Sequence, residues 1–222
     1  LRPFVIDQAR PVAANDVEIR ARRFVLALPA APAIPEIPGL AGASYLTINR
    51  LLEVEECPRH LIVIGAGATG LACAQVFRRL GAEVTVLDAA APLGTEDPEC
   101  AAILLDALAG EEIAVRGGVH IERIEKTASG VRAVFIEGET EQSVEGSHLL
   151  LATGYRTDLH ALGLEMAGIE HERGGVLTGS NLRTSNSRVF SIRDEPGAAH
   201  IARWHAQLVL QNVLFRSPVL AG

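Results

Sequence analysis

Three glycines with the spacing Gly65-x-Gly67-x-x-Gly70 follow the apolar segment 61–64 (LIVI) and open a segment of helical periodicity, residues 68–81. Each glycine has a physical reason in such a pattern. Gly65 permits the tight turn from strand to helix, Gly67 lets a pyrophosphate approach the backbone, and Gly70 lets the helix pack closely against the sheet. The free N–H groups at the start of the helix would then bind the phosphates. The pattern predicts a dinucleotide-binding loop whose residues are Gly65, Ala66, Gly67, Ala68, Thr69 and Gly70.

An acidic residue, Asp88, ends the next apolar segment, residues 82–88 (AEVTVLD), eighteen positions beyond Gly70. A carboxylate at this place can accept hydrogen bonds from the adenosine ribose hydroxyls of a dinucleotide. Its charge would repel a 2′-phosphate, and residues 89–94 (AAAPLG) contain no arginine or lysine. We therefore expect NAD as cofactor, with NADH preferred over NADPH.

The surrounding elements have the periodicities of an α/β protein. Apolar segments predict buried strands, apolar residues at helical spacing predict helices, and alternation over residues 131–137 predicts an antiparallel meander beside a parallel sheet. Asp97 and Pro98 mark the start of a second helix. A proline-rich connector at 29–40 precedes these elements. The expected strands are 60–65, 82–88, 112–116, 119–126, 131–137 and 148–153. The expected helices are a short one within 45–58 and longer ones at 68–81, 97–110 and 198–215.

Composition excludes several classes of function. The formal net charge is −7 and arginine clusters are sparse, so we expect no nucleic-acid partner and no membrane partner. Seven scattered histidines have no metal-ligand spacing, which predicts no metal site. The three cysteines, Cys57, Cys73 and Cys100, form no C-x-x-C pair, and we expect buried, inert thiols in a cytoplasmic protein. An ordinary dehydrogenase with its own substrate would need a catalytic set such as a tyrosine and a lysine, but the single lysine, Lys126, forms no motif with Tyr45 or Tyr155. We expect no catalytic residue in this chain.

Three longer segments resemble the class I pyridine nucleotide-disulfide oxidoreductases, in the branch of dihydrolipoamide dehydrogenase and mercuric reductase. They are ARRFVLALPAAPAIPEIPGL (21–40), HLLLATGYRTD (148–158) and LRTSNSRVFSIRDEPGAAHIARWHAQLVLQNVLF (182–215). The resemblance implies an FAD-dependent enzyme that passes hydride from NADH to FAD and then electrons to a disulfide or a metal ion. It also implies a Rossmann-like FAD/NAD(P)-binding fold and a homodimer in the full-length protein.

By the same resemblance, residues 44–156 form the NAD(P)-binding domain, and residues 1–43 and 157–222 are partial segments of the FAD domain. The chain begins at Leu1 and contains no paired redox cysteines, so we expect a fragment that is inactive alone.

The resemblance also implies further cofactor-binding residues, namely Ala152, Thr153, Gly154 and Asp194. The chain departs from the family pattern at four places, one of which is Tyr155, where an arginine is usual after Ala152-Thr153-Gly154. Ala72 stands where a glutamate is usual, Leu28-Pro29 replaces the last residues of an Ala-Thr-Gly motif, and Arg193 replaces a glycine. These departures leave open a second hypothesis, a non-catalytic NAD-binding sensor or a divergent member with a weakened flavin site.

Overall fold

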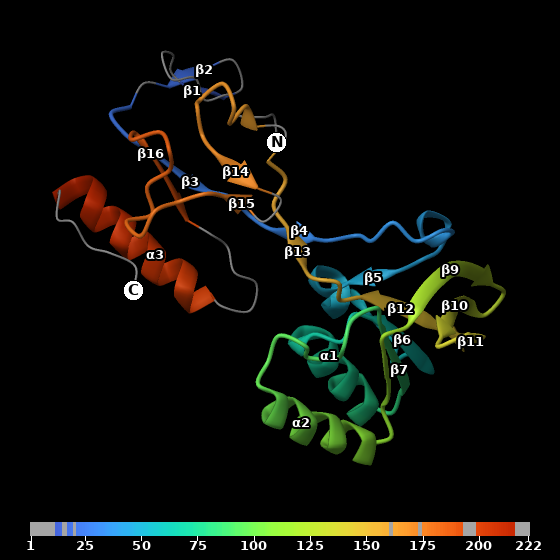
Figure 1. Cartoon of the computed structure of the whole chain (residues 1–222). Helices are drawn as coiled ribbons and strands as arrows, with labels where there is room; N and C mark the ends of the chain where they lie inside the picture. The colour runs from blue at the N-terminus through green and yellow to red at the C-terminus, as the bar shows by residue number, and fades with distance from the viewer. Residues whose placement is uncertain are drawn as a thin grey trace. The chain divides into compact units, whose positions relative to one another are not determined.

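The computed structural model describes residues 12–14, 17–19, 21–159, 162–172, 175–192 and 199–215 (Figure 1). The chain divides into two compact units. One is continuous and comprises residues 32–154; the other is discontinuous and comprises residues 1–31 and 155–222. The proline-rich segment 32–43 belongs to the continuous unit by its contacts, whereas the sequence placed it with the preceding segment.

A five-stranded parallel sheet forms the centre of the continuous unit. Its order is β5-β12-β6-β7-β8, and every neighbouring pair is parallel. The strands are β5 (Leu46–Thr47), β6 (His60–Ile64), β7 (Glu83–Asp88), β8 (Ala114–Gly117) and β12 (His148–Leu151). Both faces of the sheet are covered, which explains why β6 reads as an uninterrupted apolar run.

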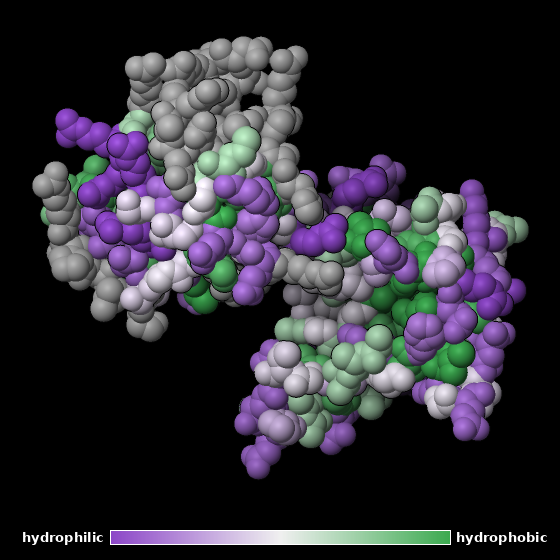
Figure 2. Space-filling model, turned by 45° about the horizontal axis from the view of Figure 1, so that its top comes forward, coloured by the Kyte–Doolittle hydropathy of each residue, from purple (hydrophilic) through white to green (hydrophobic). Residues whose placement is uncertain are grey.

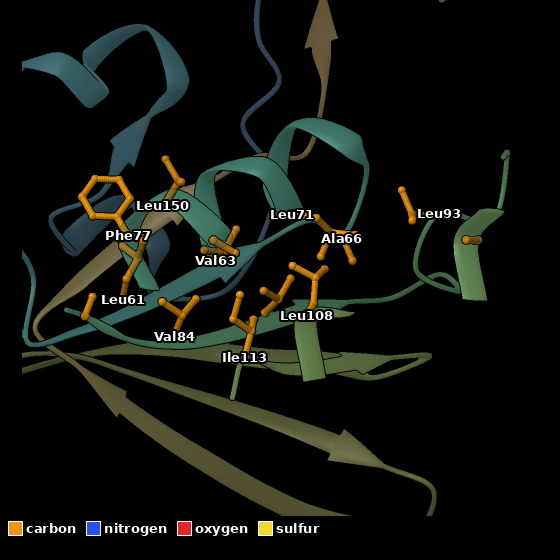
Figure 3. Close-up of a cluster of buried hydrophobic side chains, with 14 residues drawn as sticks. Leu61, Val63, Ala66, Leu71, Phe77, Val84, Leu93, Leu108, Ile113 and Leu150 are labelled. Carbon is orange, nitrogen blue, oxygen red and sulfur yellow. The ribbon is translucent and has the colours of Figure 1, made fainter. Parts of the chain in front are cut away.

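Two helices, α1 (Ala68–Arg79) and α2 (Pro98–Gly110), pack against one face of the sheet (Figures 1 and 3). Successive side chains of a strand point to opposite faces, so Leu61 and Val63 of β6 lie in the cluster beneath these helices. Helix α2 begins as predicted, because the side chain of Asp97 accepts hydrogen bonds from the backbone N–H groups of Glu99 and Cys100.

An antiparallel meander covers the opposite face of the sheet. It consists of β9 (His120–Thr127), β10 (Gly130–Glu137) and β11 (Thr140–Gly146) in the order β11-β10-β9. Its apolar face packs with Ile62 and Ile64 of β6 in a second cluster. The sequence did not predict β11, because TEQSVEG is polar and this edge strand is mostly exposed.

The discontinuous unit is built on two parallel strands, β3 (Phe24–Ala27) and β16 (Val189–Ile192). The predicted helix over 198–215 is α3 (Ala199–Leu210) followed by a π-helical turn, η4 (Gln211–Phe215). Arg23 donates hydrogen bonds to the carbonyl oxygens of Asn212 and Val213 in that turn. The remaining short elements in the described part of the chain are β1 (Val12–Ala14), β2 (Val17–Ile19), β4 (Ala31–Pro32), η1 (Leu40–Gly42), η2 (Ile48–Glu53), β13 (Tyr155–Arg156), β14 (His171–Glu172) and β15 (Gly175–Val176). The helix expected within 45–58 is thus the 3₁₀ helix η2.

Large apolar side chains are exposed on both units, and Figure 2 shows a green apolar area on the visible face of the continuous unit with polar residues around it. The exposed apolar side chains include Val76, Leu80 and Ile103 in the continuous unit and Leu210, Leu214 and Phe215 in the discontinuous unit. Within the described residues, no helix has the length and apolar character needed to cross a membrane.

Glu111, directly after α2, binds the end of α1. Its carboxylate accepts hydrogen bonds from Arg79 (2.6 and 3.0 Å) and from the Gln75 amide (2.8 Å). The hydrogen bond from Arg79 is the main cause that lowers the pKa of Glu111. A lowered pKa in the folded state means that the ionised form stabilises the fold above the unfolded pKa, about 4.3, and that this stability is lost as pH falls through the folded pKa.

We expect Glu111→Gln to lower the free energy of unfolding at pH 7 and to have a smaller effect as the pH falls below about 4. Urea unfolding of both proteins between pH 3 and pH 7 measures this difference. Glu139→Gln, in the exposed turn between β10 and β11, serves as the matched control. A loss of stability at Glu111→Gln that does not change with pH would contradict the expectation.

Candidate nucleotide-binding site

The turn from β6 into α1 requires glycine at position 65. Gly65 has φ = 111°, a conformation that residues with a side chain rarely adopt. Its N–H donates to the carbonyl oxygen of Leu87 at 2.8 Å, and a Cβ at this position would overlap the carbonyl oxygen of Ala152. The turn is therefore packed between the ends of β7 and β12.

Gly70, in the first turn of α1, is the point of closest contact between the helix and this turn. A Cβ on Gly70 would overlap the carbonyl oxygen of Gly65 and lie 3.1 Å from the Cβ of Ala152. The backbone of α1 can approach the sheet this closely only because residue 70 has no side chain.

Gly67 differs from both, because the fold itself gives no reason for a glycine there. Its φ of −75° and ψ of 173° are open to any residue, and no atom beyond its two chain neighbours lies within 4 Å of where its Cβ would be. Gly67, Ala68 and Thr69 are exposed, and no side chain among the described residues caps the first N–H groups of α1. These N–H groups and the positive end of the helix dipole suit an anion, and a glycine at 67 leaves room for it.

Asp88, half-buried at the end of β7, lies beside the same turn. One carboxylate oxygen accepts the N–H of Ala66 at 2.5 Å and the other accepts the N–H of Ala90 at 2.8 Å. Each carboxylate oxygen can accept a second hydrogen bond, so the residue can hold the loop and still bind a ribose hydroxyl. Arg116, on the neighbouring strand β8, is already paired with Glu137 at 2.7 Å.

Leu93 also contacts this turn, which the sequence did not predict. Its N–H donates to the carbonyl oxygen of Ala66 at 3.1 Å, and both side chains are buried. Leu93 adopts φ = 53°, a left-handed conformation that costs a residue with a side chain about 1–2 kcal/mol. No sequence pattern distinguishes such a leucine from an ordinary loop residue.

Residues 152–154, which follow β12 and were expected to bind the cofactor, are hydrogen-bonded to their surroundings within the continuous unit, in part to the proline-rich segment 29–40. Ala152 donates its N–H to Ile64 at 2.7 Å and lies beside Gly65 and Gly70. The Thr153 hydroxyl donates to the carbonyl oxygen of Ala33 at 2.6 Å, and Gly154 accepts the N–H of Ala33 at 2.9 Å.

The structure thus brings together residues 65–70, Asp88 and Ala152. Thr153 and Gly154 follow Ala152 directly but are hydrogen-bonded to Ala33. Asp194 and Arg193 lie outside the described residues.

The cysteines correct one expectation. Cys57 and Cys100 are exposed and Cys73 is half-buried, whereas all three were expected to be buried. Burial raises the pKa of the Cys73 thiol, which favours the unreactive protonated form. The described residues contain no disulfide and no group of three or more side chains placed to hold a metal ion.

A parallel sheet with a glycine turn, an open helix N-terminus and a carboxylate on the next strand defines an α/β domain of the dinucleotide-binding class. The sequence profile of one family, the pyridine nucleotide-disulphide oxidoreductases, matches residues 4–206. The chain belongs to this family, whose members are FAD-dependent oxidoreductases that use nicotinamide nucleotides. The resemblance and the fold class expected from the sequence are thereby confirmed.

Named relatives support this assignment. The chain is 34% identical over 210 residues to mercuric reductase from Streptomyces lividans, covering 91% of this chain and 44% of that protein. It is 35% identical over 171 residues to dihydrolipoyl dehydrogenase from Thermus scotoductus, covering 73% and 37%. The chain therefore spans less than half the length of these relatives.

Solved structures show the same fold. The flavoprotein disulfide reductase RclA from Escherichia coli aligns with a TM-score of 0.85 at 24% identity, covering 98% of this chain and 51% of that one. LpdA from Mycobacterium tuberculosis aligns with a TM-score of 0.83 at 26% identity, covering 98% and 50%.

Proposed function

We propose that residues 65–70 and Asp88 bind NADH, and that this chain is the nicotinamide-nucleotide-binding part of an FAD-dependent oxidoreductase. The observation that carries the proposal is Gly67, whose missing side chain is explained by a ligand and by no neighbour in the fold. In the whole protein, hydride would pass from NADH to FAD, and electrons would then pass to a disulfide or a metal ion.

Each part of the site has one role in binding. The N–H groups of Gly67 and of the first turn of α1 would hold the pyrophosphate, and Asp88 would accept the ribose hydroxyls. When bound, the nicotinamide supplies the hydride. Ala152, Thr153, Gly154 and Asp194 are proposed as further cofactor-binding residues. The assignment of residues 44–156 as the NAD(P)-binding domain and of the flanking segments to an FAD domain is likewise a proposal, as are the cytoplasmic location and the homodimer.

A second function, an NAD-binding sensor without flavin chemistry, is favoured by two observations. Ala72 is an exposed residue of α1 and provides no carboxylate, and Leu28 packs against the apolar cluster around Leu26 instead of offering a hydroxyl. The flavin absorbance of the purified full-length protein separates the two functions. A bound flavin supports the oxidoreductase, and a colourless protein that still binds NADH supports the sensor.

Asp88→Ala tests the proposed cofactor preference. The wild-type chain is expected to bind NADH more tightly than NADPH, and the substitution is expected to weaken NADH binding about 10- to 100-fold without weakening NADPH binding equally. This range corresponds to the loss of one charge-assisted hydrogen bond to the ribose. Calorimetric titration of both nucleotides gives the ratio of affinities, which is the decisive quantity because Asp88 also holds Ala66 and Ala90.

Asp106→Ala, an exposed carboxylate of α2, is the control and should leave both affinities unchanged. A preference for NADH that survives Asp88→Ala would contradict the role of Asp88. A wild-type chain that binds neither nucleotide would overturn the proposed function.

A further inference from the structure

Two successive peptide groups of the glycine turn are held by β7 and by the loop that follows it. The Gly65–Ala66 peptide is held through its N–H, which donates to Asp88 at 2.5 Å. The Ala66–Gly67 peptide is held through its carbonyl oxygen, which accepts the N–H of Leu93 at 3.1 Å. The orientation of the turn is therefore determined by residues 20 or more positions further along the chain.

The second of these bonds determines where the N–H of Gly67 points. A trans peptide group is planar, so its C=O and N–H point in opposite directions, and the described residues contain no cis peptide bond. Because the carbonyl oxygen of Ala66 points to Leu93, the N–H of Gly67 points away from Leu93. Apart from its two chain neighbours, no residue places an atom within 4 Å of the Cβ position of Gly67, so this position borders open space.

The side chain of Leu93 holds the loop in this arrangement. It is 6% exposed and belongs to the same apolar cluster as Ala66 and Leu108. Figure 3 shows Leu93 at one end of the cluster with Ala66 nearby, while Phe77 lies at the other end. Burial of the leucine compensates for its left-handed backbone (φ = 53°), and without it the loop would be free to relax to a more favourable conformation.

We propose that Leu93 is a positioning residue for the pyrophosphate of the bound dinucleotide. Its buried side chain keeps its N–H on Ala66, and this bond aims the N–H of Gly67 at the phosphate. The inference rests on the proposed function, namely that this turn binds NADH.

Leu93→Ala tests the inference by removing the side chain that holds the loop. In the free protein, the amide of residue 93 is expected to exchange its hydrogen faster and the Gly67 amide resonance is expected to shift. NADH binding, measured by calorimetry, is expected to weaken about tenfold, the equivalent of one impaired charge-assisted hydrogen bond. Binding of adenosine, which has the ribose but no phosphate, is expected to be unchanged in an NMR titration.

Two further variants separate positioning from general stability. Leu93→Met retains a flexible apolar side chain of similar volume and should restore both the amide signals and NADH binding. Val84→Ala removes buried methyl groups from the same cluster, away from the turn, and should lower stability without affecting NADH affinity.

Wild-type affinity for NADH in Leu93→Ala, or an equal loss in Val84→Ala, would overturn the inference. A wild-type chain that does not bind NADH would contradict the proposed function, on which this inference rests. An unshifted Gly67 amide in Leu93→Ala would then still show that Leu93 does not orient this peptide.

Discussion

Replacing Gly67 with alanine is expected to weaken NADH binding about a hundredfold while changing the free energy of unfolding by less than about 1 kcal/mol. The backbone of Gly67 already has φ and ψ values that alanine adopts, and the added methyl group meets no protein atom within 4 Å. In the proposed complex, the same methyl group would occupy the space of the pyrophosphate and keep it from the N–H groups of α1.

Calorimetric titration with NADH and urea unfolding of the free protein measure the two halves of this prediction. Gly110→Ala is a matched control, because Gly110 also has no neighbour within 4 Å of its Cβ position and ends helix α2. NADH binding by Gly67→Ala at the wild-type affinity would show that no phosphate approaches this residue.

Gly70→Ala is expected to have the opposite effect and to lower the free energy of unfolding by about 3 kcal/mol. In a helix interior alanine is normally more stable than glycine by roughly 0.5–1 kcal/mol. Here its Cβ would overlap the carbonyl oxygen of Gly65 and press on the Cβ of Ala152, so α1 would have to move away from the sheet. The destabilisation from this steric overlap is expected to exceed the stabilisation that alanine normally gives a helix.

The urea unfolding midpoint of Gly70→Ala measures this loss, again with Gly110→Ala as the reference substitution at an unobstructed helical position. A Gly70→Ala protein as stable as the wild type would mean that α1 does not need this close contact. The two substitutions together test whether glycine is needed at position 67 for ligand binding and at position 70 for the fold.

The sequence predicted those features whose physical cause is local. Four of the five strands of the parallel sheet, both main helices of the continuous unit and the Asp97 cap follow from periodicity and from neighbouring residues, whereas β5 lies in a segment expected to hold a helix. The glycine turn could be predicted because its three glycines stand within six residues of one another.

Features that depend on distant contacts could not be predicted in this way. The polar strand β11 exists because it pairs with β10, and nothing in its own sequence marks it as a strand. The contacts of Ala66 with Asp88 and Leu93 join residues more than 20 positions apart, and the left-handed conformation of Leu93 follows from where its side chain is buried. Segment 32–43 belongs to the continuous unit through similar distant contacts, among them those of Leu40, which is 2% exposed in the cluster beneath the meander.

The division into a continuous and a discontinuous unit has a consequence for the order of folding during synthesis. Strand β3 pairs with β16, so Phe24 can pair with Val189 only after the ribosome has added that residue, roughly 10–30 s later. The continuous unit is complete in the meantime, and its two ends are joined by the hydrogen bond from Ala33 to Gly154. Closing this unit first shortens the loop that separates β3 from β16 and lowers the entropic cost of their pairing by about 1 kcal/mol. Strand β3 therefore acquires its partner only after the residues of the continuous unit have been synthesised.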